Sequence, residues 1–299
     1  MKQLLILSGK GGTGKTTVAA AFIKLSGCRA YADCDVDAPN LHLLLHPSAF
    51  PHSRPFYGMG KYEIDSTKCL HCGLCQQVCR FEAVHENNFV FFIDHLECEG
   101  CATCAYVCPA QCIKETPHHA GYLLLDKPEP VFSTAKLFPG SGNSGLLVTE
   151  VKKQLRQESI ADFEIIDGSP GIGCPVIASM NNASLILLVT EPTLSGLSDF
   201  QRIVTTAEKM HVPTAVCINK VMELSAIVEK TIDYCQKKQI PMVGLIPYDK
   251  TVSRNINQGL SVIDTDCPAK TAIMEVYQKV IQILFEKQEK SNDYRKNLD

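Results

Sequence analysis

The chain has 299 residues, 45% of them hydrophobic and 20% charged, which suits a globular protein with one large core and room for a smaller module. The net charge of −3 provides no broad basic field, so sequence-independent binding to nucleic acid through phosphate contacts is not favoured. The first apolar run is too short for a secretory signal or a membrane span, so we expect a cytoplasmic protein without membrane association. In a reducing compartment, the 15 cysteines indicate metal or cluster ligation rather than disulfides.

Short apolar runs alternate with helical patterns at both ends of the chain. Residues 3–7 predict a buried strand, and a glycine-rich turn and a helix over residues 16–25 follow it. The alternation resumes in the second half of the chain and ends in a helix beyond Pro268. It predicts an α/β fold whose mostly parallel sheet is covered on both faces. The later strands are expected at residues 163–166, 185–189, 214–218 and 242–246, with helices at 197–210 and 224–238.

A phosphate-binding loop lies between the first strand and the first helix. The sequence GKGGTGKT at residues 9–16 fits the Walker A pattern of P-loop NTPases, in the strand, loop and helix context that this motif needs. Its glycines let backbone N–H groups point at phosphate oxygens, and the helix N-terminus adds positive potential. We expect Lys15 to hold the β- and γ-phosphates of ATP and Thr16 to ligate Mg²⁺. The expected nucleotide contacts are Gly11, Gly12, Thr13, Gly14, Lys15, Thr16 and Thr17.

The middle of the chain carries a duplicated cysteine pattern. The runs CLHCGLCQQVC and CEGCATCAYVC begin at Cys69 and Cys98, so the second copy is shifted by 98 − 69 = 29 residues. Two CxxCxxCxxxC runs are typical of bacterial ferredoxins with two 4Fe-4S clusters, in which the fourth cysteine of each run ligates the other cluster. Structural zinc is the alternative, but zinc sites usually pair two CxxC knuckles. The expected ligands are Cys69, Cys72, Cys75 and Cys108 for the first cluster, and Cys98, Cys101, Cys104 and Cys79 for the second.

The cysteine-rich segment interrupts the α/β pattern. We therefore expect an inserted α+β dicluster ferredoxin domain over residues 58–117. The ATPase domain is then discontinuous and consists of residues 1–57 and 118–299. Residues 121–145, which are rich in Gly, Pro and Ser, are expected to return the chain to the ATPase domain, and their detailed structure is not predicted.

Lys10 extends the phosphate loop to KGGTGKTT, which resembles the deviant Walker A motif of the MinD/ParA/Mrp superfamily of P-loop ATPases. The sequences YADCDVDAPNL at residues 31–41 and IIDGSPGIG at residues 165–173 resemble the two switches of that superfamily, and GNSG at residues 142–145 also matches. The resemblance implies an ATP-dependent dimer in which Lys10 reaches across to the partner's nucleotide. The partner subunit is expected to be an identical chain or a related paralogue.

The same resemblance implies roles for three aspartates. Asp33 is expected to position Mg²⁺, Asp35 to orient or deprotonate the attacking water, and Asp167 to bond a magnesium-bound water. Such roles suit phosphoryl transfer, which needs positioning and charge neutralisation rather than a covalent partner. For Asp37, a cap in a proline-containing turn is an equally good interpretation.

The resemblance also places residues near the adenine base. Asn219 in CINK follows a predicted strand where the superfamily has an asparagine that reads the adenine edge. Pro247 and Tyr248 in IPYD fall at the loop that flanks the base. An asparagine after a strand is also a common turn residue.

Together these motifs predict an ATPase that couples its nucleotide state to electron transfer through two 4Fe-4S clusters, with ATP, Mg²⁺ and an unidentified redox or iron–sulfur partner protein. The cysteine-rich segment follows the first switch after a short stretch, so ordering of that switch by the γ-phosphate is expected to reposition the clusters.

Two other functions fit parts of the sequence. An iron–sulfur cluster carrier of the Mrp type is the alternative, although those relatives use a CxxC near the C-terminus, and Cys217, Cys235 and Cys267 are isolated here. An ATPase positioned on membrane or DNA would need a basic amphipathic tail, whereas the last helix has the pattern of a packing helix. Cys174, just beyond the second switch, is either a structural residue or a thiol at a mobile position.

Overall fold

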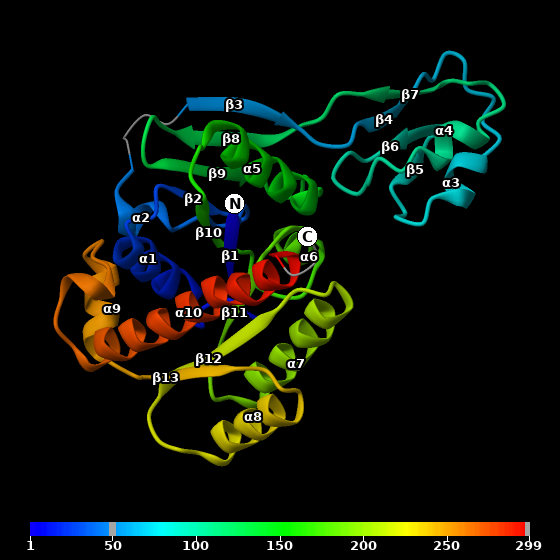
Figure 1. Cartoon of the computed structure of the whole chain (residues 1–299). Coiled ribbons are helices and arrows are strands. Elements are labelled where there is room, and N and C mark those ends of the chain that lie inside the picture. Colours follow the sequence, from blue (N-terminus) through cyan, green and yellow to red (C-terminus); the bar gives the residue numbers. More distant parts are fainter. Residues whose placement is uncertain (48–51, 297–299) are drawn as a thin grey trace.

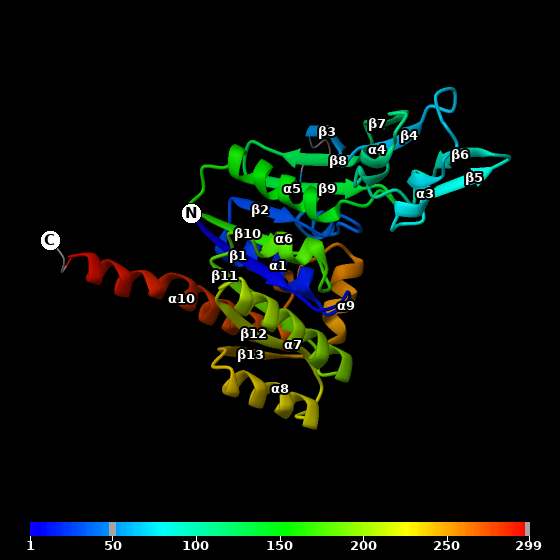
Figure 2. The same ribbon diagram turned by 90° about the vertical axis from the view of Figure 1, so that its right-hand side faces the viewer.

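The computed structural model describes residues 1–47 and 52–296. In this part of the chain, one nine-stranded sheet carries helices on both faces, and a smaller lobe projects beyond one of its edges (Figures 1 and 2). From one edge to the other, the sheet consists of β13 (Met242–Pro247), β12 (Thr214–Val221), β11 (Leu185–Thr190), β1 (Lys2–Leu7), β10 (Phe163–Asp167), β2 (Ala30–Asp33), β9 (Val131–Leu137), β8 (His119–Asp126) and β3 (His52–Tyr57).

The helices divide between the two faces of the sheet and the lobe. The apolar residues of one face contact α5, α6, α7 and α8, and those of the other face contact α1, α2 and α10. The two faces are apolar because the central strands are buried on both sides, as the continuous runs LLIL and LILLV require. The helices are α1 (Lys15–Ser26), α2 (His42–Leu45), α3 (Leu74–Val78), α4 (Thr103–Val107), α5 (Ser144–Glu158), α6 (Cys174–Met180), α7 (Leu194–Lys209), α8 (Ala226–Lys237), α9 (Lys250–Asn257), a 3-10 turn (Val262–Asp264) and α10 (Pro268–Lys296).

The prediction of a mostly parallel sheet is confirmed. Strand β1 pairs in parallel with β10 and β11, and the parallel arrangement continues through β2 and β9 on one side and through β12 and β13 on the other. Strands β8 and β3 are antiparallel additions at the β9 edge. The carboxyl ends of β1, β10 and β2 therefore meet at one edge of the sheet, where α/β folds bind their ligands.

The segment at residues 121–145 is more regular than its composition indicates. Most of it forms β8 and β9, and α5 begins at Ser144. Strand β9 is hard to identify from its sequence, VFSTAKL, because polar residues occupy two of its buried positions. Ser133 satisfies its hydroxyl by donating to the Val151 carbonyl of α5 at 2.8 Å, so this polar residue can lie under the helix.

The lobe reproduces the sequence repeat in its secondary structure. Strand β4 (Lys61–Ile64), helix α3 and strand β5 (Val84–Asn87) correspond, with the same 29-residue shift, to β6 (Val90–Ile93), α4 and β7 (Ile113–Thr116). Each helix follows a residue in the left-handed region, Gly73 in one copy and Ala102 in the other. The copies interlock, because β4 pairs with β7 and β5 pairs with β6.

The lobe has an apolar core of its own and joins the sheet through one pair of strands. Its buried core residues come from positions 62–113. The strands that connect it, β3 and β8, are antiparallel partners, and the N–H of Gly58 donates to the carbonyl of His118 at 3.2 Å. The two ends of the lobe therefore lie side by side.

Helix α10 packs along the sheet through the apolar positions that its sequence repeats. Ile273, Val276 and Val280 are buried in the core of the α1 face, and Ile283 packs against that core. The interpretation as a packing helix is confirmed for this part of α10. Among the described residues, no helix combines the length and the apolar character that crossing a bilayer requires.

The adjacency of the lobe's two ends generates a prediction. We expect a variant in which an Asn-Gly turn replaces residues 58–117 to fold, because that turn closes antiparallel strands such as β3 and β8. Thermal unfolding followed by circular dichroism should show one cooperative transition, and Mg-ATP should raise its midpoint. If the purified variant shows no cooperative transition, the sheet domain does not fold without the lobe and the prediction is wrong.

Candidate functional site

The phosphate loop connects the end of β1 to the start of α1. Gly12 and Gly14 have φ values of 79° and 91°, which an L-residue with a side chain rarely adopts. Gly14 precedes the helix, and no side chain caps the first turn. The first N–H groups of α1 therefore point into the loop without an intrahelical partner, which is the arrangement that binds phosphate.

A cavity of about 450 Å³ opens over this loop, a volume typical of small-molecule sites. It lies at the carboxyl ends of the strands, and α2 and α9 contribute apolar walls that were not predicted, among them Leu44 and Val252. The predicted nucleotide residues that line it are Gly11, Gly12, Thr13, Gly14, Lys15, Thr16, Thr17, Asp35, Asn219, Pro247 and Tyr248.

Lys15, Asp167 and Asp33 form a buried charged group behind the loop. The Lys15 ammonium lies 2.5 Å from Asp167 Oδ1, and both side chains are almost completely buried. Burial alone would lower the pKa of Lys15, but the neighbouring carboxylates, Asp167 first, raise it above its ordinary value. Burial, and then the charge of Asp167, raise the pKa of Asp33 to about 7, although Lys15 opposes the shift. The group contains two carboxylates and one ammonium, so it attracts an additional positive charge.

Asp33 also organises the loop that follows β2. Its Oδ1 accepts from the N–H of Asp35 at 3.0 Å, and its Oδ2 accepts from the N–H groups of Asn40 and Leu41 at 2.9 Å each. Asp35 lies at the cavity wall, where burial raises its pKa, whereas Asp37 is exposed. The structure thus brings Asp35 to the cavity wall, keeps Asp33 buried behind it and leaves Asp37 in solvent.

Lys10 is not part of the cavity lining. Its ammonium forms an ion pair with Glu191 and donates to the Ser195 hydroxyl at 3.1 Å. Glu191 also lies 3.5 Å from Lys220, which in turn donates to the carbonyl of Gly12. Partial burial would raise the pKa of Glu191, but Lys10 and Lys220 hold it below its usual range. Glu191 was not predicted, because a lone carboxylate after a strand carries no motif.

Asn219 supports the phosphate loop. Its side-chain amide donates to the Thr13 carbonyl at 2.7 Å, and its oxygen accepts from the N–H of Lys220 at 2.9 Å. The amide lies so close to Gly14 that a Cβ there would collide with it. Pro247 and Tyr248 lie on the same side of the cavity as α9, and Tyr248 is about half exposed. Contact of these three residues with adenine stays a prediction.

The eight repeated cysteines separate into two groups in the lobe. Each group surrounds a small cavity with three cysteines from one run and the last cysteine of the other run, as the crossed pairing predicts. The other residues around both cavities are mainly apolar, such as Phe91 at one and Tyr62 at the other. The first cavity has Cys69, Cys72, Cys75 and Cys108, and the second has Cys98, Cys101, Cys104 and Cys79.

A ninth cysteine, Cys112, lies at the first cavity and was not predicted to do so. Its sulfur is 3.5 Å from that of Cys108. Burial, and then the interaction with Cys108, raise the pKa of Cys112 to about 12, whereas hydrogen bonds hold the pKa of Cys108 below its ordinary value despite burial. The thiolate, which is the form that ligates metal, is therefore favoured at Cys108 over Cys112.

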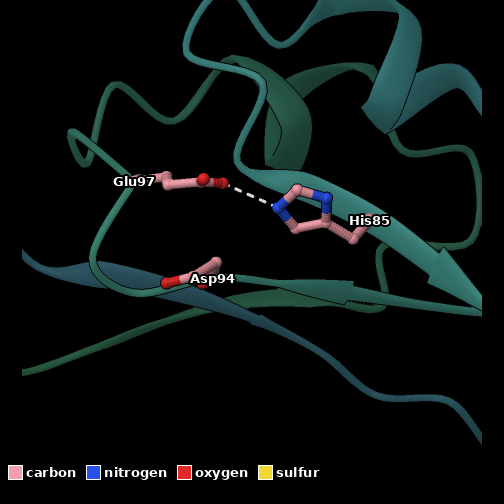
Figure 3. A group of neighbouring side chains, drawn as sticks. All are labelled: His85, Asp94 and Glu97. Atoms are coloured by element: carbon pink, nitrogen blue, oxygen red, sulfur yellow. Dashed lines mark hydrogen bonds and ion pairs between the residues drawn. The ribbon is translucent and has the colours of Figure 1, made fainter.

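His85, Asp94 and Glu97 place three ligand-type atoms within 4.8 Å of one another at the surface of the lobe (Figure 3). His85 Nε2 and Glu97 Oε2 are 2.6 Å apart. Asp94 has a separate task, because its carboxylate accepts from the N–H of Leu96 and its carbonyl accepts from the N–H of Cys98. We interpret this group as a turn that positions Cys98.

The remaining cysteines are spread over the ATPase domain. Cys28, Cys34, Cys217 and Cys235 are buried in the ATPase core, and burial raises the pKa of each thiol. Cys174 is exposed at the first position of α6, directly after the segment that resembles the second switch.

Comparison with known proteins identifies the family of the ATPase domain. The CobQ/CobB/MinD/ParA nucleotide-binding domain (CbiA) matches residues 4–262 of the chain. The chain belongs to this family. The CobQ/CobB/MinD/ParA assignment agrees with the deviant Walker A motif and with the parallel sheet, and members of the MinD/ParA branch are ATPases.

Individual relatives extend over nearly the whole chain. An uncharacterised protein of Methanocaldococcus jannaschii is 30% identical over 94% of this chain and 97% of its own length. An iron–sulfur cluster carrier protein of Pyrococcus abyssi is 26% identical over 95% of this chain and 87% of its own. The septum site-determining protein MinD of Pyrococcus horikoshii, solved with Mg-ADP, has the same fold, with a TM-score of 0.58 and 19% identity over 96% of this chain and 98% of its own.

The buried charged group generates a second prediction. Asp167→Asn removes the closest carboxylate of Lys15 but leaves Asp33 beside it, so we expect the free energy of unfolding of the nucleotide-free protein to fall by about 1.5–3 kcal/mol, the value of a hydrogen bond between charged groups. The exposed pair of Asp266 with Lys270 provides the control, because Asp266→Asn removes a carboxylate from solvent and should leave stability nearly unchanged. Urea titrations of both variants measure the difference. Equal stabilities would show that Asp33 alone balances Lys15.

Proposed function

We propose that this chain is an ATP-hydrolysing iron–sulfur protein that couples its nucleotide state to electron transfer through two 4Fe-4S clusters. One observation carries the proposal: a phosphate-loop cavity and two cysteine-lined cavities occupy one chain, and a single strand pair joins the parts that contain them. The domain boundaries at residues 58 and 117 belong to the same proposal.

The residues of the phosphate loop supply the groups that ATP hydrolysis needs. Backbone N–H groups of residues 11–16 are available to phosphate oxygens, and Lys15 adds a fixed positive charge at the β- and γ-phosphates. Thr16, Asp33 and Asp167 are the oxygen donors for Mg²⁺, directly or through water, and oxygen ligands are those that this ion prefers. We assign the orientation of the attacking water to Asp35, which lines the cavity.

The geometry of the cysteine groups favours iron–sulfur clusters over zinc. A tetrahedral zinc ion holds thiolates at about 2.3 Å, which brings its ligand sulfurs to within about 4 Å of one another. Among the described residues, no three cysteine sulfurs lie within 4.8 Å of one another. Wider spacing suits a four-iron cube, which receives one thiolate at each corner and supplies a one-electron redox centre when bound.

The two cysteine groups can be tested separately. Cys72→Ser and Cys101→Ser each remove an exposed ligand from one cavity, so each variant should lose about four of about eight irons per chain. Cys267→Ser, in the ATPase domain, should keep all of them. Iron and acid-labile sulfide analysis after anaerobic purification measures the loss. Zinc in place of iron in the unaltered protein would end the proposal.

Cluster carriage is the second candidate, and the names of the Pyrococcus relatives at 25–26% identity favour it. The two functions differ in what leaves the protein. A carrier transfers its cluster to an apo-protein, whereas an electron carrier keeps it through repeated oxidation and reduction. Incubation with an apo-ferredoxin under anaerobic conditions, followed by separation and iron analysis of both proteins, distinguishes them.

We further propose that ATP drives formation of a dimer in which Lys10 leaves Glu191 for the partner's nucleotide. A partly exposed ion pair contributes up to about 1 kcal/mol, which corresponds to about fivefold in an equilibrium constant. Glu191→Gln should therefore strengthen ATP-dependent dimerisation by up to about fivefold for each lysine released. Sedimentation velocity with Mg-ATP measures the dimer, and Glu208→Gln, at the exposed pair with Lys238, is the control. Weaker dimerisation of Glu191→Gln would show that Glu191 acts within the dimer interface.

A further inference from the structure

The two cysteine cavities are not equivalent in their relation to the ATPase domain. In the second cysteine loop, Gly100 lies against Met59 and Gly60, the residues that lead from β3 into the lobe. The buried ammonium of Lys61 donates to the carbonyl of Cys98 in the same loop. The first loop instead presents Leu70 and Leu74 to solvent, with exposed fractions of 67% and 39%.

A short segment of the ATPase domain also contacts the second cysteine loop. This segment, residues 140–145, runs from the turn after β9 into the first two residues of α5 and is called the glycine segment below. A Cβ placed on Gly142 would be 3.2 Å from the Glu99 carboxylate, and one on Gly140 would be 3.5 Å from Leu96. A Cβ placed on Gly58 would likewise be 3.4 Å from Asn143 Nδ2. The glycine segment therefore touches both the loop that carries Cys98 and the base of the lobe.

The other end of the glycine segment touches the region after the second switch. A Cβ on Gly145 would lie 3.2 Å from Cys174 Cβ and 3.3 Å from the Cys174 backbone. Cys174 begins α6, immediately after residues 167–173, and α6 packs against α5. Within that stretch Pro170 lines the nucleotide cavity, and the N–H of Gly171 donates to the Ser8 carbonyl of the phosphate loop at 3.0 Å.

We propose that the glycine segment couples the nucleotide pocket to the second cysteine group, and that Glu99 is the positioning residue through which the coupling acts. The inference rests on the proposed function. The nucleotide-responsive cluster is then the one held by Cys98, Cys101, Cys104 and Cys79, and the first group is the outer cluster. A Cβ on Gly145 would lie 3.3 Å from the Cys174 backbone, and one on Gly142 would lie 3.2 Å from the Glu99 carboxylate, both closer than ordinary van der Waals contact. The glycine segment thus packs closely at both of its ends, so a shift of the second switch is passed on along it.

The test compares midpoint potentials of the two clusters without nucleotide, with Mg-ADP and with Mg-ATP. Anaerobic redox titration followed by electron paramagnetic resonance gives both potentials, and the Cys72→Ser and Cys101→Ser variants assign each signal. We expect nucleotide to shift the potential of the second cluster and to leave that of the first unchanged. Glu99→Ala should abolish the shift.

Glu86→Ala is the matched control, because it removes an equal charge from an exposed position of β5 in the same lobe, and it should retain the shift. A shift confined to the first cluster, or one that persists in Glu99→Ala, would overturn the inference. If nucleotide moves neither potential in the unaltered protein, the proposed coupling fails as a whole.

A second measurement does not depend on the variants loading their clusters. Hydrogen exchange of the unaltered protein should change at residues 140–145 and at residues 95–101 when Mg-ATP is added. Unchanged exchange at both segments, alongside changed exchange in the phosphate loop, would also overturn the inference.

Discussion

The ion pair between Lys15 and Asp167, with Asp33 beside it, is the constraint on which the rest of the structure depends. The parallel register places Asp167 opposite Asp33 on adjacent strands, and Ile6 of β1 lies opposite Asp167. Two carboxylates thus lie next to each other at the buried ends of their strands, where a cation or a proton must offset their repulsion. Lys15 supplies one such charge. The phosphate loop, the two segments that resemble switches and the cavity lie around the charge that remains to be balanced.

This arrangement explains why the main parts of the site were predictable from sequence. A Walker A motif fixes a strand, a glycine loop and a helix together, so the positions of β1 and α1 followed from it. The partners of the motif were less accessible. Asp33 carries three backbone hydrogen bonds in addition to its charge, and Glu191 holds Lys10 from the loop after β11. Such contacts depend on which strand ends lie side by side, and the sequence pattern does not specify strand order.

The lobe was predictable for a different reason. Its cysteine spacing repeats after 29 residues, and the strands and short helices repeat with the same shift. The cysteine pattern in the sequence therefore indicates the local fold as well as the expected ligands. The sheet edge next to it was not predicted. Strands β8 and β9 lie in a segment rich in Gly, Pro and Ser, and a buried hydroxyl such as that of Ser133 has a partner only because α5 covers it. The position of the cysteine groups relative to residues 165–173 was likewise not predictable, because it depends on tertiary contacts.

The side-by-side ends of the lobe link the state of the cysteine groups to the stability of the whole sheet. A folded lobe holds Gly58 and His118 together, as a tight turn would. An unfolded lobe is a flexible loop about thirty times longer than such a turn. Each doubling of loop length costs about 0.6 kcal/mol of closure entropy, so the pairing of β3 with β8 costs about 3 kcal/mol more. Unfolding of the lobe therefore lowers the free energy of unfolding of the sheet by about 3 kcal/mol, although it removes no contact within the sheet itself.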